Sequence, residues 1–376
     1  METIPRPLDV INNNNDLEVL GTFSNFPCFM GCVDQPFEQD KFYDMCFHIS
    51  SSSGCIQLNP ILPLELVYQN DHGSGVVGSL WNQHHDAFAS FLRKFQVSSV
   101  LEIGGGTGIL AKKYASHNHW TIIDPNPNLI PNSGATAVKA FFSADLILDC
   151  EFDSIVHSHV IEHVYDFNEF LSTVGKFLGL GKRMYFSVPN LQKMFELFHT
   201  NVINFEHTVL LSEAHIDYLL AKHKFRIIDK QYFLNSHSIF YAVEQDNTVE
   251  ASVLDVGLYQ HNRQLFWDYV FYYDNLIDKL NKQIANHNGD LYLFGAHIFS
   301  QFLINRGLDI SKIKYIIDND VNKQGKRLYG TRLFVKSPKI LGNAQNPGVI
   351  LKVSNYREEI MTDILDHINS STIFYE

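Results

Sequence analysis

The segment Val100–Leu110 constrains the fold more than any other part of the chain. It reads Val-Leu-Glu-Ile-Gly-Gly-Gly-Thr-Gly-Ile-Leu, an apolar run that leads through a glycine-rich turn into the start of a helix. Glycines allow a tight turn and let a ligand come close to the backbone amides. A strand followed directly by a helix is typical of a parallel α/β sheet. We therefore expect an α/β fold with a ligand site at this turn.

Short β-branched runs alternate with helical patterns from this segment to about residue 245. The strand candidates are Ser99–Ile103, Trp120–Ile123, Phe152–Val156 and Arg183–Val188. The helix candidates are His85–Phe95, Gly108–Ala115, Phe167–Leu178 and Glu213–Lys224. This alternation predicts a parallel sheet with helical crossovers. Two closing strand candidates, Phe225–Asp229 and Ser238–Val243, suit an antiparallel addition to the sheet edge.

The flanks of this unit differ from it and from each other. The first 80 residues consist of short apolar bursts between turn formers and predict an irregular cap, and Asp71–Gly75 predicts a mobile loop. Asp255–His287 is free of glycine and proline after Gly257 and predicts a long connecting helix. Further strand and helix candidates follow it: Leu291–Phe294, a helix to Asn305, Lys314–Ile317, Val349–Val353 and Arg357–Ile368. We therefore expect a cap (1–80), a central domain (81–250) and a smaller C-terminal αβ domain (251–376).

Two acidic residues accompany the glycines. Asp124 lies twenty residues after Gly104, at the end of the next strand candidate, where a carboxylate can accept hydrogen bonds from both ribose hydroxyls of an adenosine. Glu102 lies inside the strand just before the glycines. A carboxylate there suits a cationic amino group and repels a pyrophosphate, which disfavours a dinucleotide.

A third segment, Ser158-His-Val-Ile-Glu-His-Val164, follows the strand candidate Phe152–Val156. Together with the glycine turn and Asp124 it resembles the class I methyltransferases that depend on S-adenosylmethionine (SAM), over roughly residues 85–245. The resemblance implies a Rossmann-like fold, SAM as cofactor and a set of cofactor-binding residues. This set is Glu102, Gly104, Gly105, Gly106, Gly108, Asp124, Phe142, Ser143, Ser158 and His159.

The same segment also admits a metal alternative. His159-Val-Ile-Glu-His163 matches the H-x-x-E-H pattern of one class of zinc peptidases. That chemistry needs both histidines on one face of a continuous helix, whereas this segment directly follows a strand candidate. We therefore assign no metal ligands.

The flanks resemble a more particular family, the C-methyltransferases of nucleotide-linked deoxysugars. The resemblance rests on Ser53–Leu58, Leu62–Tyr68 and Trp81-x-x-His-His85 before the glycine turn, and on Phe294-Gly-Ala-His297, Ile316–Asp320, Lys323-Gln-Gly325 and Tyr329-Gly-Thr331 near the end. It implies a nucleotide sugar as acceptor, with the C-terminal domain as a wall of the acceptor site. Trp81 and His85, together with the loop Gly73–Gly75, are candidates for a lid over the cofactor.

The N-terminal cysteines depart from that family. The family usually holds zinc on two Cys-x-x-Cys pairs, but Cys28 and Cys32 are separated by three residues, and Ser50 and Ser53 stand near the place of the second pair. We expect these cysteines to be ordinary buried side chains rather than ligands of a structural zinc.

The catalytic segment is Asn204-Phe-Glu-His207. The family has Tyr-His-Glu-His at this place, so the resemblance implies Glu206 and His207 as the pair that removes a proton from the acceptor. Asn204 and Phe205 replace the tyrosine and the first histidine. Methylation of an oxygen in a sugar or phosphorylated glycan precursor is therefore an alternative, and so is a non-catalytic protein that binds SAM or a sugar nucleotide. A further alternative makes Glu206 and His207 solvated residues before a helix over Leu211–Lys224.

Charge and hydropathy limit the partners. Lys and Arg number 29 against 41 Asp and Glu, a formal net charge of −12, which argues against binding of nucleic acid over a broad surface. No window approaches 18 uninterrupted apolar residues, so no membrane span is expected. The polar first 20 residues and the odd count of five cysteines favour a cytoplasmic protein.

Overall fold

The computed structural model describes residues 2–67, 79–148, 151–234 and 237–376. The expected loop Asp71–Gly75, and with it the lid segment Gly73–Gly75, lies outside the described residues.

The middle part of the chain forms a seven-stranded sheet, with strand order β11-β12-β9-β8-β5-β6-β7. All neighbours pair in parallel except β12, which runs antiparallel to both β9 and β11. This confirms the predicted α/β fold and the antiparallel addition at one edge. The strands are β5 Ser99–Ile103, β6 His119–Asp124, β7 Thr136–Lys139, β8 Ser154–Ser158, β9 Arg183–Pro189, β11 Phe225–Phe233 and β12 Ser238–Gln245.

The direction of the strand order reverses beside β5. The chain moves outward from β5 to β6 and β7, and then returns so that β8 and β9 lie on the other side of β5. The loops that leave β5 and β8 therefore diverge. A crevice outside the carboxyl ends of the strands at such a reversal is where open α/β sheets bind ligands.

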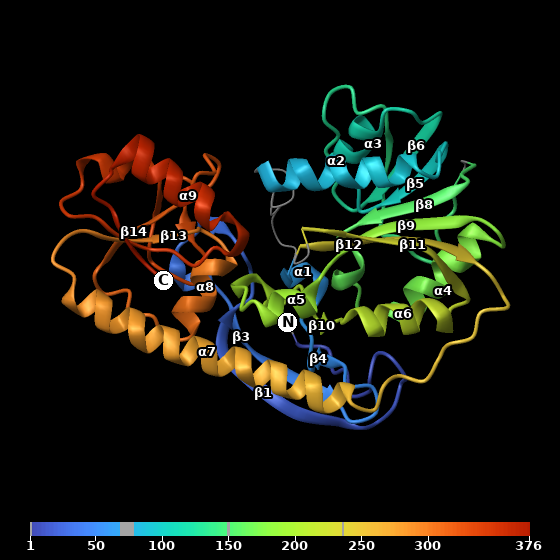
Figure 1. The fold of residues 1–376 in the computed structure, drawn as a ribbon, viewed down its shortest axis with the longest axis horizontal. Helices are drawn as coiled ribbons and strands as arrows, with labels where there is room; N and C mark the ends of the chain where they lie inside the picture. Colours follow the sequence, from blue (N-terminus) through green and yellow to red (C-terminus); the bar gives the residue numbers. More distant parts are fainter. Residues whose placement is uncertain (1, 68–78, 149–150, 235–236) are drawn as a thin grey trace.

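Helices cover both faces of this sheet (Figure 1). On one face α2 (Ser79–Arg93) and α3 (Ile109–Tyr114) pack on Val100, Val156 and Tyr185. On the other face α4 (Phe167–Leu178) and α6 (Glu213–Lys222) pack on a cluster that includes Leu101, Ile155 and Phe186. The 3.6-residue periodicity predicted α4 to the residue, because Asp166 caps its start and Gly179 follows its last residue.

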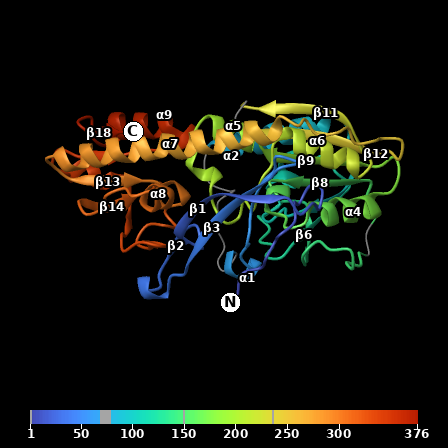
Figure 2. The same cartoon turned by 90° about the horizontal axis from the view of Figure 1, so that it is seen from below.

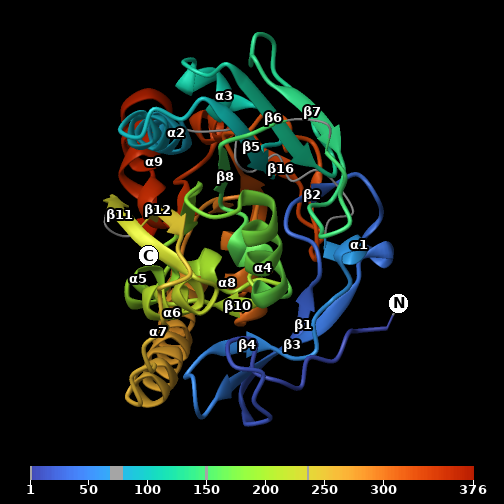
Figure 3. The same ribbon diagram turned by 90° about the vertical axis from the view of Figure 1, so that its right-hand side faces the viewer.

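The N-terminal region is not the irregular cap that the sequence predicted. β1 (Leu17–Pro27) and β3 (Phe42–Ser50) form a long antiparallel pair in a four-stranded sheet of order β1-β3-β4-β10. The register shifts twice along β1, so apolar residues do not alternate regularly in its sequence. Figure 3 shows these strands below the seven-stranded sheet. The other members are β4 (Ile56–Leu58) and β10 (Val209–Leu210).

The C-terminal region contains a second parallel sheet, of order β16-β14-β13-β17-β18. The helix α7 (Leu258–Asn286) leads to this sheet and packs along both the N-terminal sheet and the C-terminal sheet (Figures 1 and 2). The remaining elements here are β13 Leu291–Phe294, α8 Ile298–Asn305, β14 Ile313–Ile317, β16 Val335–Lys336, β17 Gly348–Ile350, α9 Arg357–Asp363 and β18 Ile373–Tyr375.

Several predicted boundaries were wrong by a few residues. β8 begins two residues later than the predicted strand, at Ser154, and β17 ends at Ile350 rather than Val353. The last helix changes at Ile364 from α-helix to a π-helical turn. The sequence analysis missed β7, which lies at the sheet edge and has no buried residue to produce a pattern.

The N-terminal and C-terminal regions share one hydrophobic core. It joins side chains of β1 and β3, of α7, and of β13 and β14, such as Phe23, Phe47, Tyr273 and Leu293. The short strands β2 (Cys32–Val33) and β15 (Arg327–Leu328) pair directly. None of the helices in the described part of the chain has both the length and the apolar character that crossing a bilayer requires.

Candidate functional site

The glycine turn after β5 lies directly above the buried carboxyl group of Glu102. Gly104 has φ +71°, a region that favours glycine, and its N–H donates to the carbonyl of Ile123 at 2.8 Å. A Cβ atom on Gly105 would lie 2.6 Å from Cδ of Glu102. Glycine at this position therefore allows the loop to cross the carboxyl group closely.

Glu102 is held in a fixed position. Its Oε2 accepts a hydrogen bond of 2.7 Å from Nε1 of Trp120, and the residue is only 3% exposed. Burial raises the pKa of Glu102 to about 7, although the hydrogen bond from Trp120 acts in the opposite direction. A cationic group placed at the loop would favour the ionised form of this carboxyl.

Asp124 joins the end of β6 to the same loop. Its Oδ2 accepts from the N–H of Gly106 at 3.0 Å, and its Oδ1 accepts from the N–H of Asn126 at 2.7 Å. A Cβ atom on Gly106 would meet only Asp124 Oδ2, at 3.8 Å, so the space above the loop is open there. An open loop between two carboxyl groups fits an adenosyl cofactor with a cationic amino group.

Phe142 and Ser143 follow β7 at the same edge of the sheet. Phe142 is partly buried against α4, with ring centroids 5.8 Å from Phe170 and 5.3 Å from Phe177. Ser143 is exposed. Their assignment to the cofactor stays a prediction.

The segment after β8 turns sharply at His159. Ser158 is the last residue of β8, and His159 has φ +53° and donates its N–H to the carbonyl of Ser187 at 2.9 Å. A single 3-10 turn, Ile161–His163, follows. No continuous helix carries His159 and His163 together, so the segment lacks the geometry of the zinc-peptidase pattern.

The structure brings this segment against the predicted catalytic pair. Nδ1 of His163 lies 3.8 Å from Oε2 of Glu206, and its Nε2 lies 3.8 Å from Oε1 of Glu162. The rings of His163 and His207 lie 5.5 Å apart. Glu206 is 9% exposed, so it is not a solvated residue at a helix start. Two segments more than forty residues apart thus meet beside the carboxyl end of β8.

His207 is a neutral imidazole held by contacts at its Nδ1. Its Nδ1 lies 3.0 Å from the carbonyl oxygen of Val202, an acceptor, and 3.1 Å from the amide nitrogen of Asn204, a donor, so either tautomer of the ring finds a partner there. Burial lowers the pKa of His207 to about 4, so the ring is neutral at pH 7. Asn204 Oδ1 accepts the N–H groups of Glu206 and His207, both at 2.9 Å. The asparagine therefore holds the turn that presents the pair.

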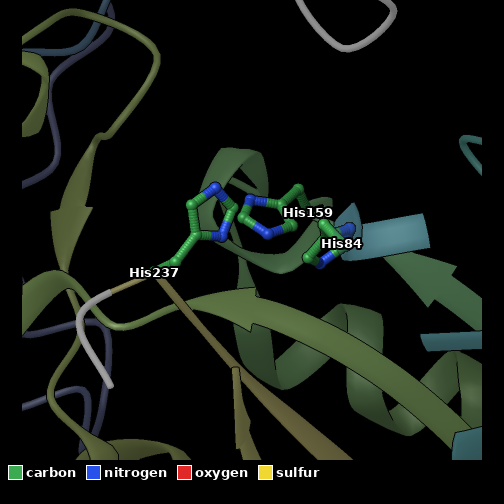
Figure 4. A group of neighbouring side chains, drawn as sticks. All are labelled: His84, His159 and His237. Atoms are coloured by element: carbon green, nitrogen blue, oxygen red, sulfur yellow. The ribbon is translucent and has the colours of Figure 1, made fainter. Parts of the chain in front are cut away.

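The sequence analysis missed a cluster of three histidines at this edge. His84 on α2, His159 after β8 and His237 before β12 point toward one another (Figure 4), and each offers a ring nitrogen within 4.8 Å of the others. Burial lowers the pKa of His159 and His237 to about 3, so both rings are neutral. Trp81 covers the cluster, with ring centroids 5.2, 4.9 and 5.3 Å from His84, His159 and His237. No local spacing could reveal these contacts, because they join three distant segments.

The cysteines lie apart from this site. Cys28 contacts the hydroxyl of Tyr329 at 3.4 Å, and Cys32 Sγ lies 3.5 Å from the carbonyl of Ala296. In the described ranges no cysteine belongs to a group of three or more potential metal ligands. Cys150 lies outside the described residues.

Residues 81–230 match a protein-family model described as a methyltransferase domain. No curated protein sequence matches the chain. Among solved structures, the N-methyltransferase NodS from Bradyrhizobium japonicum has 15% identity and a TM-score of 0.33, covering 44% of this chain and 96% of that one. Magnesium protoporphyrin IX methyltransferase from Synechocystis, with S-adenosylhomocysteine bound, has 16% identity and a TM-score of 0.35, covering 46% and 90%.

Proposed function

We propose that this SAM-dependent methyltransferase, whose residues 81–230 match a methyltransferase domain, acts on a nucleotide-activated sugar or a related glycan precursor. His207 is the proposed general base, and Glu206 is its acidic partner. The observation that carries this proposal is the contact of Glu206 and His207 with the segment after β8, at the carboxyl edge of the sheet.

The cofactor residues that we propose lie at the carboxyl ends of β5, β6 and β8 and in the segment after β7. Glu102 and the glycine turn would hold the amino acid part of SAM, and Asp124 would hold the ribose, with Phe142, Ser143, Ser158 and His159 around them. When bound, SAM supplies a methyl group on a positively charged sulfur. The protein then has to orient the acceptor and remove one proton. In the tautomer whose Nδ1 donates to Val202, Nε2 of His207 takes the acceptor's proton.

The acceptor class is supported by the units that flank the methyltransferase domain. In the proposed domain division, residues 1–80 and 251–376 lie outside the methyltransferase domain itself. The C-terminal unit approaches α2, since the hydroxyl of Ser79 donates to Oε2 of Glu359 at 3.0 Å. A neighbouring unit of this kind suits an acceptor with two parts, such as a sugar and its nucleotide. The net charge of −12 disfavours a nucleic-acid acceptor.

Methylation of an oxygen is the alternative that one observation favours. The tyrosine and first histidine of the similar family are replaced by Asn204, which holds the turn, and Phe205, whose ring packs 6.1 Å from that of Phe26. The segment 204–207 thus supplies one histidine, rather than the tyrosine and two histidines of the similar family. A single base is sufficient for an alcohol whose proton leaves during methyl transfer.

The test is an incubation of the purified chain with methyl-labelled SAM and a panel of nucleotide sugars, free sugars and nucleotides. We expect label on the sugar of a nucleotide sugar, and NMR then distinguishes a C-methyl from an O-methyl product. Label on free sugars alone would contradict the nucleotide requirement. Absence of S-adenosylhomocysteine with every acceptor of the panel would favour a non-catalytic binding protein.

A further inference from the structure

The three histidines of the cluster come from separate elements and form a nearly equilateral group. Their ring centroids lie 5.1 Å (His84–His159), 5.5 Å (His84–His237) and 5.8 Å (His159–His237) apart. His84 is fully buried, and His237 is 5% exposed. Burial of three imidazoles costs free energy of desolvation that their partners have to offset.

Polar groups around the cluster fix the direction of the rings. Nε2 of His159 and Nδ1 of His237 both bond to the hydroxyl of Ser238, at 2.8 and 2.7 Å. Nε2 of His84 bonds to the hydroxyl of Ser187 at 2.8 Å. Ser187 lies on β9 and Ser238 on β12, which are neighbours in the sheet. The ring nitrogens are therefore already turned toward this part of the sheet edge.

A buried carboxylate stands behind His159. Oε1 of Glu162 lies 3.3 Å from Nδ1 of His159, on the side of the ring opposite to Ser238, and Glu162 is 1% exposed. A carboxylate on the far nitrogen of an imidazole is the usual partner of a metal-bound histidine, because it sets the tautomer and raises the basicity of the ligating nitrogen. This second contact is independent of the grouping of the three rings.

We propose that His84, His159 and His237 bind one divalent transition-metal ion, such as Zn²⁺, with Glu162 supporting His159. Neutral imidazole suits zinc, cobalt, nickel and copper rather than magnesium or calcium. Three histidines leave one position of a tetrahedral ion open. Ligand nitrogens lie about 2.1 Å from zinc, so the three rings must approach by roughly 1 Å and exchange their serine hydroxyls for the ion.

The open position gives the ion a role in methyl transfer, and this part rests on the proposed function. His159 directly follows the proposed cofactor residue Ser158, so the ion would lie next to the proposed cofactor site, where an acceptor could reach it. An acceptor hydroxyl on the ion would lose its proton more easily, as a zinc-bound water does. His207 would then receive that proton.

The experiment uses the full chain without an affinity tag, treated with a chelator and titrated with Co²⁺, whose visible absorption reports coordination, and then with Zn²⁺ in competition. We expect one equivalent of metal per chain. Replacement of His84 or His237 by alanine should weaken binding at least about 100-fold, and Glu162→Gln about 10-fold. His157→Phe is the matched control, because His157 is buried on β8 two residues before His159, stacks 4.8 Å from Phe186, and is not one of the three histidines.

The proposal would be overturned if the intact chain bound no stoichiometric metal, or if the double variant His84→Ala/His237→Ala bound it fully. Loss of the metal in Cys28→Ser/Cys32→Ser would also overturn it, since the ion would then belong to the cysteines. Thermal unfolding and calorimetry with SAM show whether each variant is folded, and His84→Gln serves if the alanine variant is not. Metal binding is measured without SAM or acceptor, so it can succeed when the proposed sugar methylation fails.

Discussion

Glu102 shows how one residue can link stability and ligand binding. The fold keeps its carboxyl group beneath the glycine turn, where only Trp120 donates a hydrogen bond to it among the bonds described. The pKa of Glu102 is raised from its ordinary value of 4.5 to about 7. The unfolded chain therefore loses this proton at lower pH than the folded chain does, and the contribution of Glu102 to stability falls as the pH rises from 4.5 to 7.

We predict that Glu102→Gln stabilises the protein at pH 8 and weakens SAM binding. The amide still accepts from Trp120 but carries no buried charge, so the free energy of unfolding at pH 8 should rise by about 3 kcal/mol. At pH 5 the gain should be small, because the native carboxyl is protonated there. Denaturant unfolding at both pH values and calorimetry with SAM measure these effects. An equal gain at both pH values would contradict the argument, and Glu358→Gln on the exposed face of α9 is the control.

Substitutions of Asp124 and of His207 should have different effects: the first should weaken SAM binding, and the second should slow turnover. Asp124→Ala removes the acceptor of the proposed ribose hydroxyls and should weaken SAM binding roughly 10-fold, with little effect on turnover at saturation. His207→Ala removes the proposed base and should lower kcat about 100-fold while SAM affinity stays nearly constant. Calorimetry and steady-state kinetics check both, with the exposed His119→Ala as control. Unchanged turnover in His207→Ala would remove this residue from the catalytic site.

At the scale of elements, the segment between α5 (Leu191–Glu196) and β10 connects the N-terminal sheet to Glu206 and His207, the proposed catalytic pair. β10 pairs with β4, and the guanidinium of Arg6 donates to the carbonyls of Leu58 and Thr208. The turn that carries Glu206 and His207 is therefore anchored in the N-terminal sheet as well as in the methyltransferase domain. Rigid support of this kind keeps a base at a constant distance from its substrate.

Asn204→Ala tests the turn itself. It removes the oxygen that accepts the N–H groups of Glu206 and His207, so two buried donors lose their partner. We expect turnover to fall about 10-fold by displacement of His207, with SAM affinity unchanged. Asn204→Asp keeps an accepting oxygen and should restore most of the turnover. If both variants lose the same activity, the hydrogen bonds to this oxygen do not position His207. Asn118→Ala, at an exposed site, is the control.

At the scale of the whole molecule, one buried ion pair joins the two flanking regions. Both oxygens of Asp40 accept from the guanidinium of Arg327, at 2.6 and 2.8 Å, and the two side chains are 0% and 6% exposed. Asp40 also accepts from the N–H of Gly330. The N-terminal and C-terminal regions thus share a polar contact in addition to their common core.

Removal of one partner of this ion pair should lower the stability of the folded protein. Arg327→Met leaves the carboxylate of Asp40 buried without its cation, and we expect a loss of about 3–5 kcal/mol in the free energy of unfolding. The double variant Asp40→Leu/Arg327→Met should recover most of that loss, since no charge remains buried. Arg332→Met, which breaks the exposed pair with Glu38, should change stability little. A double variant as unstable as Arg327→Met would contradict the explanation by buried charge.

The buried histidines predict that the folded protein loses stability at acidic pH. Burial lowers the pKa of His199 and His207 from 6.5 to about 4 and lowers that of His215 as well. Between about pH 6.5 and 4 the unfolded chain binds these protons and the folded chain does not, so stability is lost as the pH falls through this range. Glu102 and Glu162 act in the opposite direction, but histidines with lowered pKa outnumber them.

We therefore expect the melting temperature of the metal-free protein to fall steadily from pH 6.5 to pH 4. Thermal unfolding at half-unit steps measures this dependence. His199→Gln should make it less steep, since one buried imidazole no longer takes up a proton on unfolding. A melting temperature that is constant or rises toward pH 4 would show that the buried carboxyls dominate.

The sequence alone determined the methyltransferase core. The strand, the glycine turn and the helix that follows are local features, and α4 and β5 were predicted to the residue, because cap residues and hydrophobic periodicity act within one or two turns of the chain. Asp124 was placed beside the glycine turn because parallel strands end at the same sheet edge. The tertiary structure alone decided which distant segments meet. It placed β10 in the N-terminal sheet, His163 against Glu206, and His84, His159 and His237 around one point. Those contacts depend on packing between elements, and no spacing within a single segment encodes them.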